Sequence, residues 1–486
     1  MKLLPLPART RGNVIIARID TNSLGFTPTR VWNPSPSSHH RTRPYPLPKT
    51  IRTGTRVTEE SGAKFSPAPF AVVVRGAGRQ TLIAVQADSG WHRWSFVDFH
   101  VDETGAEVRI DLEGHTPASK AVKHVRVFAL PGKKGEESMA LVARGLAALY
   151  PAASTRRKKI PSWWHRPIYC GWGDQVAISL DVEGPGPECR AMAYCTQGLY
   201  QRWVDRLEMA GVPVGTVTID NGWSPGGVWT PYPNHWPDLR GFIDRQHRKG
   251  RRVLLWLGTF LTEDLPDEWC IFSGRKKVIA DPTNPKYRAF VRNQVRRLLS
   301  PEVGGYNADG FKIDQLAFSP TETETWISEQ FGRSWPLPNP HPKLKLAGTT
   351  WGCEVLYLLQ KEIYDAAKSV KPDALITSST VHPYFYDSFD MVRLHDTETV
   401  NVDVFEAMRA RANLARAALP GFPIDADDWV WKDYRKWLDY TARNAQLGTA
   451  CLFYAERFVR RFDKNPTVIP IPLRDLCKIA RAWSGT

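Results

Sequence analysis

The chain has 486 residues, of which 42% are hydrophobic and 24% are charged, and its net charge at pH 7 is +15. This composition is close to the average of globular proteins, so it excludes a chain that is disordered throughout. No run of about 18 apolar residues is present, which excludes an α-helical membrane span. We therefore expect a soluble, cytoplasmic protein with roughly two to four domains, or one barrel with an appendage.

Much of the positive charge lies near the start of the chain. The first 56 residues hold ten basic residues and the single acid Asp20, and a second basic cluster follows at 156–159. No aromatic residues alternate with these charges and no helix-turn-helix pattern accompanies them, so we interpret them as a solvated arm and a linker. We expect no nucleic-acid partner, although binding of another polyanion stays open.

The seven cysteines are an odd number, and no two of them are separated by only two residues. This spacing suggests neither a disulfide framework nor a zinc site. We expect reduced, mostly buried thiols and no bound metal.

Short alternating stretches separated by turn residues occupy the first part of the chain, which predicts an antiparallel β-sandwich. A proline-rich stretch at 33–48 is typical of a long loop, and a helix is predicted at 138–149. We assign residues 1–155 to a sandwich domain with a basic, proline-rich arm. The predicted strands are 13–18, 70–74, 81–85, 107–112 and 125–129.

After Pro161 the pattern changes to strands that alternate with amphipathic helices, which favours a parallel sheet with crossover helices. Eight such units predict a (β/α)8 TIM barrel over residues 156–486. A doubly wound open sheet is the alternative, but no glycine-rich phosphate loop follows any strand. The predicted strands are 166–172, 214–220, 252–257, 310–314, 374–379, 391–394, 421–425 and 449–454, and the helices are 192–209, 239–249, 285–299, 355–370, 404–419, 433–447 and 472–483.

Polar and aromatic residues close several of these strands, where the active site of a barrel lies. Lys312 and Asp314 share one face of the fourth strand, because side chains alternate with a period of two. Asp396 falls on the loop just past the sixth strand. The other candidates are Trp172, Asp220, Asn221, Trp223, Trp256 and Arg393.

Several carboxylates with nearby tryptophans, without metal-ligand spacing or a Ser-His-Asp order, indicate sugar chemistry. A retaining glycosidase needs two carboxyl groups about 5 to 5.5 Å apart, one ionised and one protonated. Lys312 should lower the pKa of Asp314, which makes Asp314 the candidate nucleophile and Asp396 the candidate acid, with Asp425 in reserve. Each aspartate has an ordinary alternative as a helix cap or ion-pair partner, and each tryptophan as part of the core.

The order of these motifs resembles the α-galactosidase and raffinose-synthase group of retaining α-glycosidases, glycoside hydrolase family 36. The motifs are Asp220-Asn221-Gly222-Trp223, Leu255-Trp256, Lys312-Ile313-Asp314 and Arg393-Leu394-His395-Asp396. The resemblance implies that Asp314 is the nucleophile and Asp396 the acid/base. It implies further that Asp220 binds the sugar 4- and 6-hydroxyls, that Lys312 donates to a hydroxyl and that Arg393 meets the 2-hydroxyl, without a cofactor.

One departure from this group concerns the choice of sugar. The group usually has Asp-Asp-Gly-Trp where this chain has Asn221 in the second place, which weakens the inference of galactose. We predict an α-galactosidase that acts on an oligosaccharide or glycoside, with an α-galactosyl transglycosylase or an α-glucosidase as alternatives. A barrel that binds carbohydrate or a polyanion without catalysis is the alternative from another class. The oligomeric state is left open.

Overall fold

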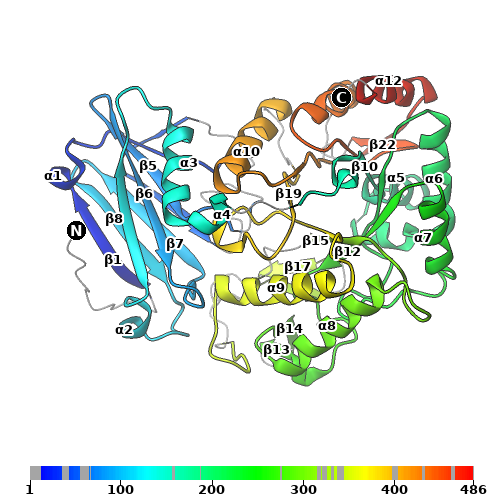
Figure 1. Cartoon of the computed structure of the whole chain (residues 1–486), viewed down its shortest axis with the longest axis horizontal. Coiled ribbons are helices and arrows are strands. Elements are labelled where there is room, and N and C mark those ends of the chain that lie inside the picture. Colours follow the sequence, from blue (N-terminus) through cyan, green and yellow to red (C-terminus); the bar gives the residue numbers. More distant parts are fainter. Residues whose placement is uncertain are drawn as a thin grey trace.

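The computed structural model describes residues 13–35, 43–54, 65, 67–155, 159–186, 188–273, 276–314, 319, 326–329, 333–336, 344–396, 403–429, 433–460 and 466–484. It combines a nearly closed eight-stranded parallel barrel with separate antiparallel sheets, in agreement with the predicted fold class (Figure 1). None of the helices in these ranges is long and apolar enough to cross a membrane. The cytoplasmic location stays a prediction.

The N-terminal part is built from two antiparallel sheets that enclose one hydrophobic core. Strand β9 illustrates why this sequence forms a half-buried strand, since Val125 and Val127 are buried and Arg126 between them is exposed. The first sheet has the order β1 (Asn13–Asp20), β8 (Gly105–Asp111), β7 (Phe96–Asp102) and β4 (Lys49–Gly54). The second has the order β3 (Tyr45–Pro46), β2 (Arg30–Trp32), β5 (Ala71–Gly76), β6 (Arg79–Ala87) and β9 (Val125–Pro131).

All five predicted strands of the sandwich are present, and β2, β3, β4 and β7 were not predicted. The stretch at 33–48, predicted as a long loop or extended arm, contains the two-residue strand β3, and residues 36–42 lie outside the described residues. The short helices α1 (Thr21–Leu24), α2 (Ala118–Ala121) and α4 (Pro151–Thr155) complete this part. The predicted helix is α3 (Ser138–Leu149), which packs on β6.

The barrel strands lie in sequence order around the sheet, and a parallel bridge between Asp425 and Thr449 closes the ring. Each predicted strand is present within a few residues, because near-continuous apolar runs are what a parallel sheet buried on both faces requires. The strands are β10 (Ile168–Cys170), β11 (Thr216–Ile219), β12 (Arg252–Gly258), β15 (Gly310–Asp314), β18 (Leu375–Ser378), β19 (Met391–Arg393), β20 (Ile424–Asp425) and β21 (Cys451–Leu452).

The helices around the barrel follow the prediction with one difference, in the first unit. The first unit contains an additional helix, α5 (Trp172–Glu183), so the prediction that the first strand runs to Trp172 is wrong. The connection from β18 to β19 has only a 3-10 turn at Pro383–Phe385 among its described residues. The remaining helices are α6 (Gln197–Met209), α7 (Leu239–Arg248), α8 (Pro285–Leu299), α9 (Cys353–Val370), α10 (Val404–Ala418), α11 (Tyr434–Arg443) and α12 (Leu473–Trp483).

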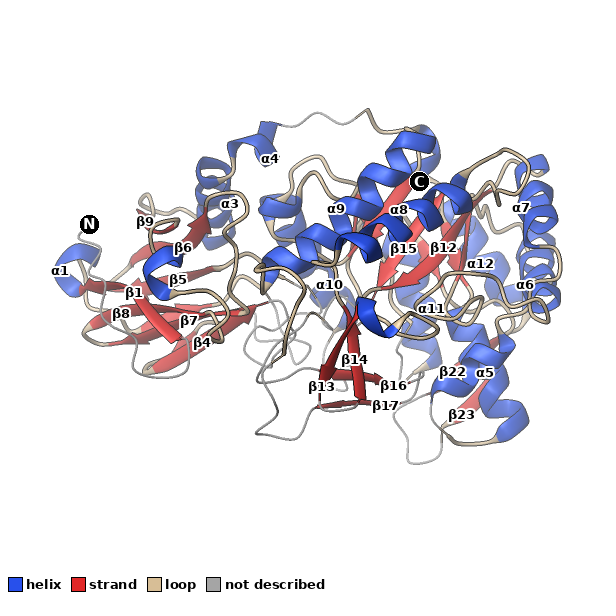
Figure 2. Cartoon of the chain, turned by 90° about the horizontal axis from the view of Figure 1, so that it is seen from below, coloured by secondary structure: helices blue, strands red, loops and turns tan. Residues whose placement is uncertain are grey.

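Three hairpins lie outside the ring: β13 (Cys270–Ser273) with β14 (Lys276–Ala280), β16 (Trp326–Glu329) with β17 (Arg333–Pro336), and β22 (Arg457–Arg460) with β23 (Thr467–Pro470). The first two lie side by side, with β14 in contact with β16 (Figure 2). The six cysteines whose side chains are described are unpaired, as expected.

The sandwich is joined to the barrel through the start of α9. Backbone bonds link Cys353 N to the Trp94 carbonyl and Glu354 N to the His92 carbonyl, both at 3.0 Å. The His92 ring stacks on Tyr384 at 3.9 Å between centroids, and neither of its ring nitrogens has a hydrogen-bond partner among the described residues. A fully buried imidazole at this junction must therefore stay neutral.

We expect acid to destabilise the protein through this junction. Burial lowers the pKa of His92 to about 3. Because the unfolded chain binds this proton near pH 6.5 and the folded chain does not, stability falls as the pH drops from 6.5 toward 3, by about 1.4 kcal/mol per pH unit. When the pH is lowered from 7.5 to 4.5, the unfolding free energy of His92→Phe should fall by roughly 3 kcal/mol less than that of the wild type. Urea unfolding at the two pH values measures this difference.

The exposed residue His165 provides the control for this measurement. His165→Phe should keep the pH dependence of the wild type, because that ring is in water in both states. If His92→Phe and the wild type lost the same stability between pH 7.5 and 4.5, His92 would not be the source of the acid sensitivity.

Candidate active site

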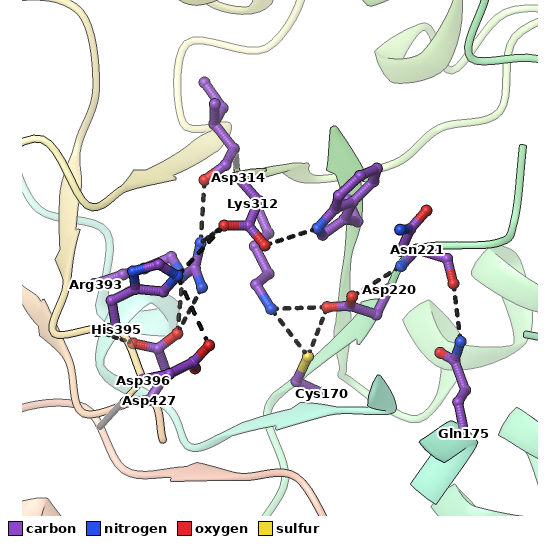
Figure 3. A network of polar contacts seen from close by, with 12 residues as sticks. Cys170, Gln175, Asp220, Asn221, Lys312, Asp314, Arg393, His395, Asp396 and Asp427 are labelled. Carbon is purple, nitrogen blue, oxygen red and sulfur yellow. Dashed lines mark hydrogen bonds and ion pairs between the residues drawn. The ribbon is translucent and has the colours of Figure 1, made fainter. Parts of the chain in front are cut away.

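Six of the predicted site residues lie close together at the carboxyl ends of barrel strands: Asp220, Asn221, Lys312, Asp314, Arg393 and Asp396 (Figure 3). Asp220 directly follows β11, Lys312 and Asp314 lie on β15, and Arg393 ends β19. Because the strands are parallel, their carboxyl ends meet at the same rim, which brings together Asp220 and Arg393, 173 positions apart in the sequence.

Lys312 pairs with Asp220 in the lower part of the site. Its Nζ lies 2.7 Å from Asp220 Oδ2 and donates to Cys170 Sγ at 3.5 Å, while the Cys170 thiol donates to Asp220 Oδ2 at 2.9 Å. Burial lowers the pKa of Lys312, but Asp220, Cys170 and Asp314 together outweigh burial and raise this pKa above its usual value. Cys170 is not among the predicted site residues.

Asp314 has three neighbours that favour its ionised form. Its Oδ1 lies 3.3 Å from Arg393 Nη1 and 3.6 Å from His395 Nε2, and its Oδ2 accepts the indole proton of Trp256 at 3.1 Å. Burial raises the pKa of Asp314, yet Arg393 and His395 together bring it well below its usual value. The expected direction is correct, but the main cause is Arg393, and Lys312 contributes less.

Arg393 is held in place behind Asp314. It is only 1% exposed, and it forms an ion pair with Asp427 Oδ2 at 2.8 Å and donates to the Ile313 carbonyl at 3.1 Å. Asp427 Oδ1 in turn accepts the backbone N–H of His395 at 2.7 Å. Asp427 is not among the predicted site residues, because the acidic run after the seventh strand carries no mark of which member faces Arg393.

Asp396 lies just past β19, as predicted. Arg411 from α10 holds this turn, because its Nη1 donates to the carbonyls of Leu394, His395 and Asp396 at 2.9, 2.6 and 3.1 Å. His395 itself has a φ of 61°, a left-handed conformation that such contacts must maintain. Residues 397–402, which continue the loop, lie outside the described residues.

The carboxylates of Asp314 and Asp396 lie on the same side of the barrel. His395 Nε2 is 3.6 Å from Asp314 Oδ1 and 3.8 Å from Asp396 Oδ2, so the sum of these distances is the greatest separation that the two oxygens can have. This limit admits the separation of about 5 to 5.5 Å that a retaining glycosidase needs. The side chains of Asp314, His395 and Asp396 are 21%, 18% and 17% exposed, so a ligand can reach all three.

The three predicted tryptophans occupy different positions. Trp256 contacts Asp314, as described above. Trp223 is fully buried, and its indole donates to the Trp256 carbonyl at 2.8 Å. It is therefore part of the core, which was the alternative to a place in the site. Trp172 is partly exposed at the start of α5 and packs edge-to-face on Trp429 at 6.1 Å.

Asn221 is buried at the same rim. Its backbone carbonyl accepts from Gln175 Nε2 at 2.8 Å, whereas its side-chain Oδ1 has no hydrogen-bond partner among the described residues. An unpaired buried acceptor costs free energy, so a ligand that donates a hydrogen bond there would recover it. In the part of the chain that the structure describes, no three His, Cys, Asp or Glu side chains are grouped to hold a metal ion.

No protein-family model matches the chain, and no curated protein matches it. Solved structures do match. A cycloalternan-degrading enzyme from Trueperella pyogenes aligns with a TM-score of 0.59 and 15% identity over 97% of this chain and 66% of its own length. A GH31 family sulfoquinovosidase from E. rectale aligns with a TM-score of 0.59 and 12% identity, over 97% and 67%.

An α-galactosidase from Thermus thermophilus is also similar, with a TM-score of 0.53 and 14% identity over 91% of this chain and 84% of its own. At these identities the similarities establish the fold, a barrel preceded by β-sheets. The chain spans about two thirds of the length of the first two proteins.

Proposed function

We propose that this protein is a retaining α-glycosidase, which removes terminal α-linked sugars through a covalent glycosyl-enzyme intermediate. The observation that supports this most directly is that Asp314 and Asp396 both approach His395 Nε2, at 3.6 and 3.8 Å. Two partly exposed carboxyl groups within one sugar's reach are what double displacement needs. The similar folds of several glycosidases support the same class.

In the proposed reaction, the ionised Asp314 attacks the anomeric carbon while Asp396 transfers its proton to the glycosidic oxygen, whose bond to that carbon breaks. Asp396, now a carboxylate, then takes a proton from water as the water oxygen displaces Asp314. Arg393 and Trp256 hold Asp314 from two sides, so the attacking carboxylate needs no rearrangement.

The remaining residues bind the sugar in this proposal. Asp220 and Lys312 would exchange hydrogen bonds with ring hydroxyls, and the Asn221 amide would accept a further one. Trp172 and Trp256 would provide apolar surface, Trp223 would support Trp256, and Arg393 would act near the 2-hydroxyl, as the resemblance to family 36 implies.

We propose that the enzyme hydrolyses α-galactosides. If an acceptor sugar excluded water from the site, the same intermediate would instead transfer galactose to that sugar. An α-glucosidase is the second candidate. Asn221 in place of the usual aspartate favours it, and so do similar structures described as a cycloalternan-degrading enzyme in complex with isomaltose and with cycloalternan.

The experiment that tests this proposal measures turnover of 4-nitrophenyl α-galactoside and α-glucoside and follows the first product by NMR. We expect turnover of at least one substrate and release of the α-anomer first, because two inversions retain the configuration. Release of the β-anomer would contradict double displacement. Binding of oligosaccharide without any turnover would instead support a non-catalytic barrel.

A further inference from the structure

A cavity of about 770 Å³ lies at one end of the sandwich, and all of its lining residues belong to the N-terminal part of the chain. Its walls are the turn between β5 and β6, the segment from α1 to β2, and the loop from β9 to the start of α3. Ligand-binding pockets have volumes of about 300 to 1,000 Å³, so this cavity is large enough for a small molecule. Four basic side chains line it: Arg75, Arg79, Lys133 and Lys134.

None of these four basic side chains has a carboxylate partner among the described residues. Arg79 Nη1 donates to the Gly25 carbonyl at 2.7 Å. The Arg75 guanidinium donates to the Ser138 hydroxyl and lies 5.9 Å from the centre of the Trp32 ring. All of these partners are neutral. Like charges that gather without counter-ions repel one another, and an anion in the cavity would remove this repulsion.

Two acids line the cavity as well, and they do not neutralise its charge. Glu136 forms an ion pair with Arg144 at 2.8 Å, and its Oε2 accepts the backbone N–H of Lys133 at 2.8 Å. The hydrogen bond from Arg144 lowers the pKa of Glu136 to about 2, so this carboxylate is ionised and its charge is matched. Glu137 is exposed. With Glu136 balanced by Arg144, four cations and one carboxylate remain, a surplus of three positive charges.

Hydrogen-bond donors at the base of the cavity add to its capacity for an anion. α3 begins at Ser138, and the side chain of the preceding Glu137 forms no capping hydrogen bond. The first N–H groups of a helix have no partner within the helix and bind anions readily. In addition, Arg75 Nε is buried without a hydrogen-bond partner among the described residues. An unpaired buried donor costs free energy, which a ligand that accepts a hydrogen bond from this guanidinium would recover.

The shape and lining of the cavity indicate a ligand larger than a free ion. Gly78 in the β5–β6 turn and Gly135 before α3 both have a φ of 73°, and a Cβ atom at either position would meet nothing within 4 Å. These two loops therefore leave the cavity open. Leu24 and Phe26 add apolar lining. A phosphate or sulfate ion would fill only a small part of this volume, and the apolar lining suits an organic group attached to it.

We propose that this cavity binds a small organic molecule that carries a phosphate or sulfate ester. Its anionic oxygens would lie among the four basic side chains and the start of α3, and its organic group would pack against Leu24 and Phe26. Arginine binds such oxygens through paired N–H donors, and lysine adds a compact positive charge. The site shares no residue with the candidate active site, so the inference does not rest on the glycosidase function. It uses part of the net charge of +15 that the glycosidase reaction does not explain.

The first test measures binding to the full chain by isothermal titration calorimetry at pH 7 and constant ionic strength. The probes are phenyl phosphate and phenyl sulfate, with inorganic phosphate, inorganic sulfate and phenol as comparisons. None of them contains a sugar. We expect at least one ester to bind with a Kd below about 1 mM and more tightly than its inorganic ion, and phenol not to bind. Equal binding of ester and free ion would overturn the ester and leave the free anion as ligand. Absence of binding by all four anions would overturn the site.

The second test places the bound anion through variants of the cavity wall. Lys133 and Lys134 are exposed, so Lys133→Ala combined with Lys134→Ala should keep the thermal unfolding midpoint of the wild type in the absence of anions. The Kd of this double variant for the ester should rise at least about tenfold, because two charged partners are lost. Glu137→Gln should instead lower the Kd about two- to fivefold, because it removes the unpaired carboxylate.

The control for these variants is Arg248→Ala, which removes an exposed cation from α7 of the barrel. Its Kd for the ester should equal that of the wild type. If the double variant bound the ester as tightly as the wild type, or if Arg248→Ala weakened binding by the same factor, the anion would not bind in this cavity and the inference would be wrong.

Discussion

Replacing Asp314 with glycine should lower kcat by about four to six orders of magnitude, because removing a nucleophile removes the covalent route entirely. The substitution also opens space beside Trp256 and Arg393, which contact the carboxylate in the wild type. Azide should enter this space, attack the anomeric carbon from the vacated side and restore turnover of an activated glycoside. The product should be the β-glycosyl azide, because one displacement inverts the α configuration.

The control for this experiment is Asp314→Asn, which has the same shape and leaves no room for azide. This variant should be as inactive as Asp314→Gly, and azide should not restore its turnover. Formation of the α-glycosyl azide by Asp314→Gly, or ordinary activity in either variant, would show that Asp314 is not the nucleophile.

Replacing Asp396 with alanine should have an effect that depends on the leaving group. Transfer of a proton by a positioned acid contributes about 10²- to 10⁴-fold, so kcat/KM for natural disaccharides should fall by this factor. For glycosyl fluorides, whose fluoride leaves without being protonated, the rate of the first step should change little. The missing general base slows the second step, so the glycosyl-enzyme should accumulate, and azide should release it as the α-glycosyl azide.

The opposite anomers expected from the two variants separate the roles of the carboxylates. Asp425→Ala is the matched comparison, because Asp425 is the reserve candidate for the acid and its pKa is raised to about 8. If Asp425→Ala showed the dependence on the leaving group and Asp396→Ala did not, the acid would be Asp425.

The barrel was more predictable than the sandwich for a physical reason. Strands buried on both faces carry near-continuous apolar runs, so β12, with its run from Val253 to Leu257, is recognisable from composition alone. The short strands β2 and β3 exist only through pairing with neighbours, and their few residues carry no period. The start of α5 at Trp172 was missed because its N-cap is Gly171, which has no side chain to form the capping hydrogen bond that marks a helix start.

Which residues reach the rim follows from the amino-acid sequence alone, because strand ends and the alternation of side chains are local properties. The sequence placed Lys312 and Asp314 on one face and Asp396 on a loop, and both placements agree with the structure. Only the tertiary structure decided which partners these residues have. Lys312 binds Asp220, Arg393 joins Asp314 to Asp427, and Arg411 holds the turn of Asp396, since closure of the barrel brings distant strands within the few ångströms over which charges and hydrogen bonds act.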